Sequence, residues 1–433
     1  MMIRNFLRCR GCEQAFVARV AADSTDSTRF YIPCPHCHLP IRARATGQEF
    51  EDHRIHFECD VLPPTSDQLK VVTINPYVPA RYDSDFDQPV GAFSTMTLQF
   101  LLGDEGFFGY FEAEGAARAT IDEGWPRVQR LYEYYLAEDW GNFDRAGRTV
   151  FSDWQAVSTI HQRTTLASQA VGTHLSLVTG QMSEPAEQFF GSYLRKHTAA
   201  IEVGAYLERM RLDGDAGDLA ALQRSVFELI GLFLTRSEMW RSGRLPRWVD
   251  PPSKLDELTL FRDEFPEMRD LYQQAFEVVC KTLRYPIAAQ NVVKRHNPDA
   301  FGDEHPGITV VPERARPSTL RQFDRLSNAH KIAYVALVPR WARMAGVLDS
   351  RVRNTIGHAS ARHDLRSGRV VSNADPDGLT YLEFLGKVFD MFEMLCVALQ
   401  ITRTARVASS RDFRSQRSVI YQDIPDSSAS AHL

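Results

Sequence analysis

Four cysteines near the N-terminus have the spacing of a metal site. Two residues separate Cys9 from Cys12 and Cys34 from Cys37, and 21 residues lie between the two pairs. Two residues between cysteines allow both sulfurs of one turn to reach the same ion, and two such turns supply the tetrahedral S4 set that suits Zn²⁺. Because four thiolates leave no position for a water, we expect one structural zinc ion per chain, with no role in catalysis.

A second group of chemically useful side chains lies between Leu348 and Ala359, where Arg353 and Asn354 precede His358. On a helix Asn354 and His358 share one face, and Arg353 lies about 140° from His358. An imidazole can move protons at neutral pH, and a guanidinium can hold phosphate oxygens as their charge grows. The alternative is that Arg353 and Asn354 are solvated and that His358 caps the helix carbonyls.

This segment resembles the signature of the HEPN superfamily, in which an arginine and a following polar residue precede a histidine. Arg353, Asn354 and His358 match it with four residues between the arginine and the histidine. The resemblance covers about 253–405, including the order of two long helices, the motif, a hairpin and a closing helix. It implies a helical homodimer that cleaves RNA through attack of the 2′-hydroxyl, without a catalytic metal. Family toxins silenced by adenylylation carry a tyrosine two residues after the histidine, where this chain has Ser360, so that type of partner is not expected.

Further basic residues surround the motif, and we expect them to contact the RNA backbone unless they form an ordinary solvated face. They are Arg351, Arg362, His363 and Arg366, with Arg369 close by. The formal net charge is −5 for the whole chain, −8 for residues 61–252 and +3 for residues 253–433. This distribution argues against a protein that coats nucleic acid generally, and it favours the C-terminal part for any polyanion.

The sequence pattern around these groups predicts a mainly α fold, divided into five segments. Apolar residues from Leu258 to Leu283 recur in steps of three and four and predict a helix, and a second long helix is expected from Ser318 to Gly346. Thr380 and Glu383 form a capping box that opens the last helix. The segments are a small β zinc ribbon (1–61), a proline-rich connector (62–94), a helical middle region (95–250), a HEPN-like helical bundle with a small β-hairpin (251–406) and a flexible tail (407–433).

With 433 residues, of which 44% are hydrophobic, the chain is long enough for several cores, and no apolar stretch is long enough to span a membrane. The first residues contain no apolar secretory segment, so we expect a cytoplasmic protein. The full prediction is a homodimeric endoribonuclease of antiphage defence or toxin type. Its ribbon and middle region would sense a phage-derived or cellular trigger, or select the RNA.

Two alternatives remain open. The first is a non-catalytic, dimerising scaffold that binds RNA or a nucleotide through the HEPN-like region and docks a protein through the ribbon. The second is a zinc-ribbon transcription regulator, which the acidic middle region and the negative net charge disfavour.

Overall fold

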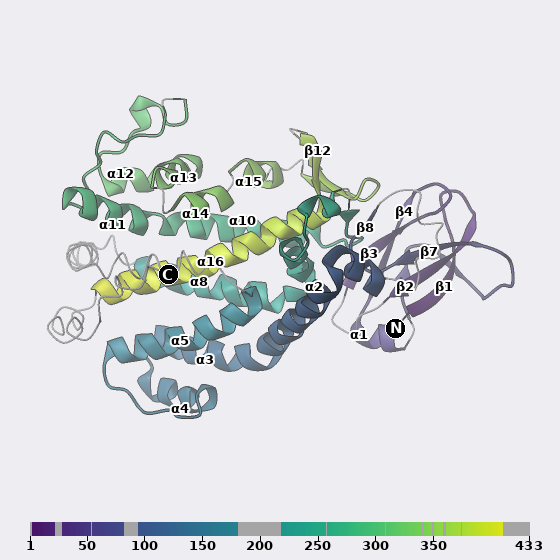
Figure 1. Cartoon of the computed structure of the whole chain (residues 1–433), viewed down its shortest axis with the longest axis horizontal. Helices are drawn as coiled ribbons and strands as arrows, with labels where there is room; N and C mark the ends of the chain where they lie inside the picture. Colours follow the sequence, from purple (N-terminus) through teal and green to yellow (C-terminus); the bar gives the residue numbers. More distant parts are fainter. Residues whose placement is uncertain are drawn as a thin grey trace. The chain divides into compact units, whose positions relative to one another are not determined.

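The computed structural model describes residues 2–21, 28–52, 54–81, 94–180, 218–256, 258–307, 309–338, 341–348, 350–357, 361–373 and 375–409 (Figure 1). The fold is mainly helical with small sheets at the N-terminus, as the sequence predicts. The chain divides into two compact units, each built from discontinuous segments. Unit 1 comprises Met1–Gly115, Leu232–Phe276 and Asp349–Phe392, and unit 2 comprises Ala116–Gly231, Glu277–Leu348 and Glu393–Leu433.

Two small sheets form the N-terminal part of unit 1. The first has the strand order β6-β1-β2-β7, and the second has the order β3-β4-β5. Alternate side chains of both sheets, such as Leu7, Phe16, Phe30 and Ile41, enter one hydrophobic cluster. The strands are β1 (Met2–Arg8), β2 (Ala15–Ala21), β3 (Thr28–Pro33), β4 (Pro40–Ala45), β5 (His56–Phe57), β6 (Asp60–Leu62) and β7 (Lys70–Ile74), with the short helix α1 (Gly47–Glu51) before β5.

The alternating run over 54–61 forms two strands instead of one. β5 pairs with β4, and β6 pairs with β1, so the chain passes from one sheet to the other between Phe57 and Asp60. Ile55 and Cys59 are buried, as the alternation predicts, but the side chain of Val61 is 58% exposed. The change of sheet ends the alternation, because β5 and β6 pair with strands of different sheets.

β7 lies within residues 62–94, where the prolines predict a connector. Its run Val71-Val72-Thr73-Ile74 is entirely β-branched, and the strand pairs in parallel with β2. The prolines at 63, 64, 76 and 79 flank the strand and do not interrupt it. Residues 82–93 of the segment lie outside the described part of the chain.

The backbone is extended from Leu258, where the apolar spacing predicts the start of a helix. β9 (Leu258–Thr259) pairs with β8 (Ala80–Arg81), and the Tyr31 backbone N–H donates to the Phe261 carbonyl over 3.1 Å. The helix α10 (Phe265–Thr282) begins only at the Phe265-Pro266 step, because proline favours the first turn of a helix. Phe261 is one of the residues of the N-terminal hydrophobic cluster.

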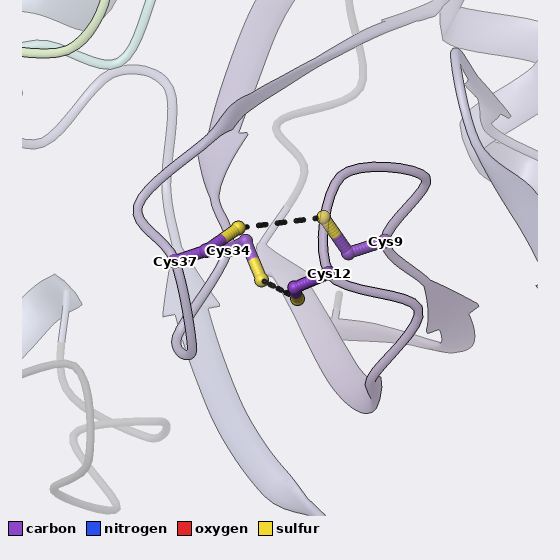
Figure 2. Close-up of side chains that lie close together, drawn as sticks. All are labelled: Cys9, Cys12, Cys34 and Cys37. Atoms are coloured by element: carbon purple, nitrogen blue, oxygen red, sulfur yellow. Dashed lines mark hydrogen bonds between the residues drawn. The ribbon is translucent and has the colours of Figure 1, made fainter.

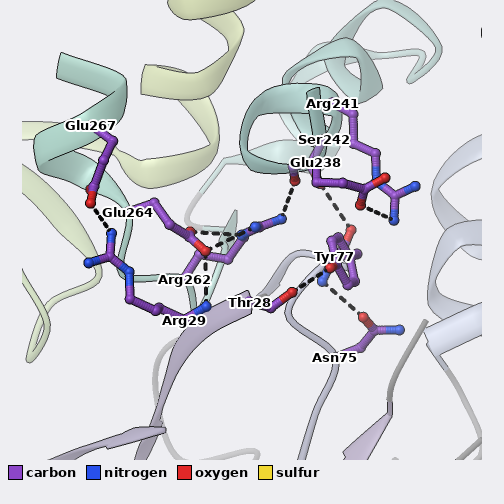
Figure 3. A network of polar contacts seen from close by, with 10 residues as sticks. All are labelled: Thr28, Arg29, Asn75, Tyr77, Glu238, Arg241, Ser242, Arg262, Glu264 and Glu267. Atoms are coloured by element: carbon purple, nitrogen blue, oxygen red, sulfur yellow. Dashed lines mark hydrogen bonds and ion pairs between the residues drawn. The ribbon is translucent and has the colours of Figure 1, made fainter. Parts of the chain in front are cut away.

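A buried ion pair secures this junction (Figure 3). Arg262 donates from Nε and Nη2 to the two carboxylate oxygens of Glu264, each over 3.0 Å, and both side chains are 1% exposed. Its Nη1 donates to the Glu238 carbonyl over 2.6 Å. The Glu264 carboxylate also accepts the backbone N–H of Arg29 in β3 over 3.1 Å. One bidentate pair thus joins β3 to the Leu232–Phe276 segment of unit 1, which is distant from it in sequence.

A second buried cluster of unit 1 contains Trp240, which packs against Phe389 and Phe392 with ring centroids 5.7 and 5.1 Å apart. A Cβ on Gly243 would overlap the carbonyl oxygen of Leu385, so only glycine fits there. Elements with residues in this unit are α2 (Ser94–Ala119), α9 (Ser237–Trp240), the 3-10 helices Arg241–Arg247 and Pro252–Leu255, α15 (Ser350–Gly357), β10 (Arg362–Asp364), β11 (Arg369–Ser372), β12 (Asp375–Thr380) and α16 (Tyr381–Ser409).

Unit 2 contains an aromatic cluster in which Tyr132 stacks on Phe227, with ring centroids 4.4 Å apart, and accepts a hydrogen bond from Gln223 over 3.0 Å. The region expected to be one helix over 318–346 is three helices. Ser327 caps the second of them by accepting the His330 N–H. Elements with residues in this unit are α3 (Trp125–Leu136), α4 (Trp140–Val150), α5 (Ile160–Thr179), α8 (Asp218–Thr235), α11 (Arg284–Arg295), α12 (Leu320–Asp324), α13 (Asn328–Ala336) and α14 (Ala342–Val347).

The closing elements follow the predictions more closely. The hairpin of β10 and β11 is present, with β12 as a third strand. Glu383 donates its backbone N–H to Thr380 Oγ1 over 3.2 Å and accepts the Thr380 N–H over 2.7 Å, which confirms the capping box. Across the described residues, no helix combines the length and the apolar character needed to cross a bilayer.

Candidate functional site

The four N-terminal cysteines converge on one point (Figure 2). Their sulfur atoms all lie within 4.8 Å of one another. The Sγ atoms of Cys9 and Cys37 are 3.7 Å apart, as are those of Cys12 and Cys34. Tetrahedral zinc with Zn–S bonds of about 2.3 Å would separate its sulfurs by about 3.8 Å. The cluster therefore has the size and the donor set for such an ion.

Both cysteine loops use the same backbone turn. The N–H of Glu13 donates to the Cys9 carbonyl over 2.8 Å, and the N–H of His38 donates to the Cys34 carbonyl over 2.9 Å. Glu13 and His38 have φ angles of 60° and 59°, in the left-handed region. One loop joins β1 to β2 and the other joins β3 to β4, so the cysteines lie on the ends of strands from both sheets.

Burial keeps part of this centre protonated when no ion is bound. It raises the pKa of the Cys34 thiol to about 12, with the Cys9 and Cys12 side chains adding to the effect. A metal must displace these protons, so its apparent affinity rises with pH. Cys59 is also buried nearby, with a pKa raised by burial to about 11, but it is not one of the four clustered cysteines.

The candidate catalytic residues begin on the short helix α15. Arg353 Nη1 donates to Asn354 Oδ1 over 3.3 Å, and Asn354 is exposed while Arg353 is half-buried. Ile356 is buried, and its carbonyl accepts a hydrogen bond from Gln273 of α10 over 3.3 Å. Packing of Ile356 and this bond fix the helix and leave the Asn354 amide at the surface.

His358 lies outside the described residues, as does Ser360, so the relation between Arg353 and His358 stays a prediction. Arg351 lies in α15, and nothing is described of its side chain. Arg362 and Arg366 are exposed, on β10 and in the turn that follows it. α15 also contacts β11, so the motif helix and the basic hairpin belong to the same part of unit 1.

A hollow of about 760 Å³ lies on the three-stranded sheet, lined among others by Arg362, Asp364 and Arg369. The Arg369 guanidinium is held by the backbone, since it donates to the carbonyls of Asp377 and Gly378 over 2.5 and 3.0 Å. β12 supplies these carbonyls, and sequence reasoning missed it as a strand. The run Asp375-Pro376-Asp377-Gly378 is typical of a turn, which concealed the strand.

His363 occupies a different environment from the exposed arginines. Its ring stacks on Tyr381 with centroids 4.5 Å apart, and it meets the Tyr31 ring edge-on at 5.8 Å. Burial lowers the pKa of His363 to about 4, against a smaller opposing effect of Asp364. The imidazole is therefore neutral at pH 7 and supplies no positive charge to a phosphate there.

This environment predicts a pH-dependent stability. The unfolded chain protonates His363 near pH 6.5, whereas the folded chain does so only near pH 4. The free energy of unfolding should therefore fall between pH 6.5 and pH 4, by up to about 3 kcal/mol from this residue. His363→Phe keeps an aromatic ring and should remove that part of the pH dependence in urea titrations. An identical pH profile in both proteins would exclude His363 as its source.

The chain was compared with protein-family models, with curated proteins and with solved structures. No family model, no curated protein and no solved structure matches it. The functional assignment therefore depends on the residues themselves and on the sites described above.

Proposed function

We propose that this protein is a metal-independent endoribonuclease with Arg353, Asn354 and His358 in its active site. The observation that carries the proposal is the hydrogen-bonded Arg353–Asn354 pair on α15, with the Asn354 amide exposed and His358 four residues further along the chain. The exposed Arg362 and Arg366 on the adjoining hairpin favour a polyanionic substrate. These features also fit the HEPN resemblance of the sequence.

In the proposed mechanism His358 transfers protons between the 2′-hydroxyl and the leaving 5′-oxygen, which requires a group that titrates near neutral pH. Arg353 stabilises the negative charge that develops on the phosphate oxygens. Asn354 holds the Arg353 guanidinium, to which its side-chain oxygen is hydrogen-bonded. The products are a 2′,3′-cyclic phosphate and a 5′-hydroxyl, and DNA is not cut because it lacks the nucleophile.

The proposal includes a homodimer and a zinc ion. One copy of the motif supplies few groups to an active site. A two-fold axis would bring two copies of Arg353 and His358 to one cleft. The zinc ion would be structural, held by Cys9, Cys12, Cys34 and Cys37 as one closed S4 set. We place the activity in antiphage defence or in a toxin, where RNA cleavage stops growth.

The test is cleavage of total RNA by the purified protein in EDTA, with analysis of the RNA ends. His358→Ala and Arg353→Ala should each reduce the cleavage rate at least about 100-fold. His330→Ala, which changes a histidine of α13 outside the motif, should leave the rate unchanged. Circular dichroism confirms that each protein stays folded in EDTA, which can remove the structural ion.

Cyclic phosphate ends produced by wild type and His330→Ala alone would support the enzyme. Equal cleavage by wild type and His358→Ala would overturn the assignment of His358. RNA binding without cleavage by a folded, metal-loaded dimer would favour the non-catalytic scaffold.

A further inference from the structure

The outer face of the β6-β1-β2-β7 sheet carries an apolar row that crosses all four strands. Phe6 pairs with Val17 on one side and with Leu62 on the other, and Val17 pairs with Val71. Phe6, Leu62 and Val71 are each partly exposed, whereas Val17 between them is buried. Their neighbours along each strand, such as Leu7 and Phe16, face the core, so this row lies on the opposite face of the sheet.

Two arginines flank this row, and their like charges face each other across two neighbouring strands. Arg4 and Arg19 are directly opposite each other in the antiparallel β1–β2 pair, two residues from Phe6 and Val17. Like charges at such positions destabilise a sheet. In the described part of the chain neither arginine forms an ion pair with a carboxylate. Among the described residues, no acidic side chain therefore relieves this repulsion.

On the other side of the row lies Arg8, which faces Asp60 across the β1–β6 pair. The Asp60 carboxylate already binds Arg10, whose Nη2 is 3.2 Å from Oδ1. Cations thus stand on both sides of an apolar row. A single-stranded nucleic acid presents the matching pattern, since its bases have apolar faces and its phosphates are negative.

We infer that this outer face binds single-stranded RNA, with bases against Phe6 and the apolar row and phosphates against Arg4 and Arg19. A duplex would not match it, because paired bases do not expose their faces to a sheet. The choice of RNA rests on the proposed function. The inference adds a substrate-binding surface in the N-terminal module, meaning the two sheets formed by β1–β7, separate from the motif on α15.

Fluorescence anisotropy tests this surface, with a labelled unstructured RNA of about 16 nucleotides and proteins that carry His358→Ala, so that no RNA is cleaved. Arg4→Ser with Arg19→Ser should weaken binding by about tenfold or more. It should also reduce the slope of log K against log salt by about 1.4, for two lost phosphate contacts. A Phe6→Leu variant should weaken binding without a change in that slope, because it removes stacking only.

The matched control is Arg42→Ser with Arg54→Ser, which removes the same charge from the same module. Both arginines are exposed, and they already pair with Asp263 and Asp52. Loss of binding in the Arg4/Arg19 variant alone supports the surface, whether or not wild type cleaves RNA. Equal binding by the two double variants, or tighter binding of duplex DNA than of RNA, would overturn it.

Discussion

Substitution of Cys34 by serine is expected to abolish metal binding and to unfold the N-terminal sheets. Structural zinc contributes on the order of 10 kcal/mol to the folding of small domains, and structural sites are almost always four-coordinate, so the loss of one thiolate leaves the set incomplete. Cys34 directly follows β3, which carries Tyr31 against His363 of the hairpin and Arg29 against Glu264. We therefore expect the loss to reach beyond the cysteine loops and to disorder β10.

Metal content per chain and thermal unfolding measure this effect. Cys59→Ser is the matched control, because Cys59 is a buried cysteine near the centre that is not one of the four ligands. It should retain one metal ion per chain. Its melting temperature should fall only as far as an ordinary core substitution lowers it. A Cys34→Ser protein that kept both its metal and its melting temperature would contradict a structural metal centre.

Removal of the Arg262 charge is the second change with a large expected effect. Arg262→Met should lower the free energy of unfolding by about 3–5 kcal/mol, because it leaves the buried Glu264 carboxylate without its partner. The Arg262→Met/Glu264→Met double variant should recover much of the loss, since two apolar side chains need no partner.

Urea unfolding of the two single variants and the double variant gives the coupling free energy directly. The exposed Arg10–Asp60 pair provides the comparison, and breaking it should cost at most about 1 kcal/mol. If Arg262→Met and Arg10→Ser lower the free energy of unfolding by the same amount, the Arg262–Glu264 pair does not secure the junction of β3 with residues 258–264.

Features that depend on neighbours in sequence were predictable. The Cys-x2-Cys spacing located the cysteine cluster, and the Thr380–Glu383 capping box located the start of α16, because both are determined within a few residues. The β10–β11 hairpin followed from the short Ser367-Gly368 turn that precedes the β-branched Val370 and Val371.

Features that depend on distant segments were not predictable. Leu258 and Phe261 have helical spacing, but the backbone of this segment pairs with β8 and β3, some 180 to 230 positions earlier in the chain. Burial of Arg262 is invisible in the sequence, since an arginine two residues before a glutamate is usually at the surface. The outer-face row became visible only when the register placed Phe6 beside Val17 and Leu62.

The composition of the N-terminal hydrophobic cluster has a consequence for biosynthesis. Ile3 and Leu7 share this cluster with Phe261 and Leu365. A ribosome that adds about 5–20 residues per second therefore releases the first strands tens of seconds before their last core partners exist. The core of the N-terminal module is therefore complete only after Leu365 has been translated, and a product that ends before Phe261 lacks both of these distant core side chains.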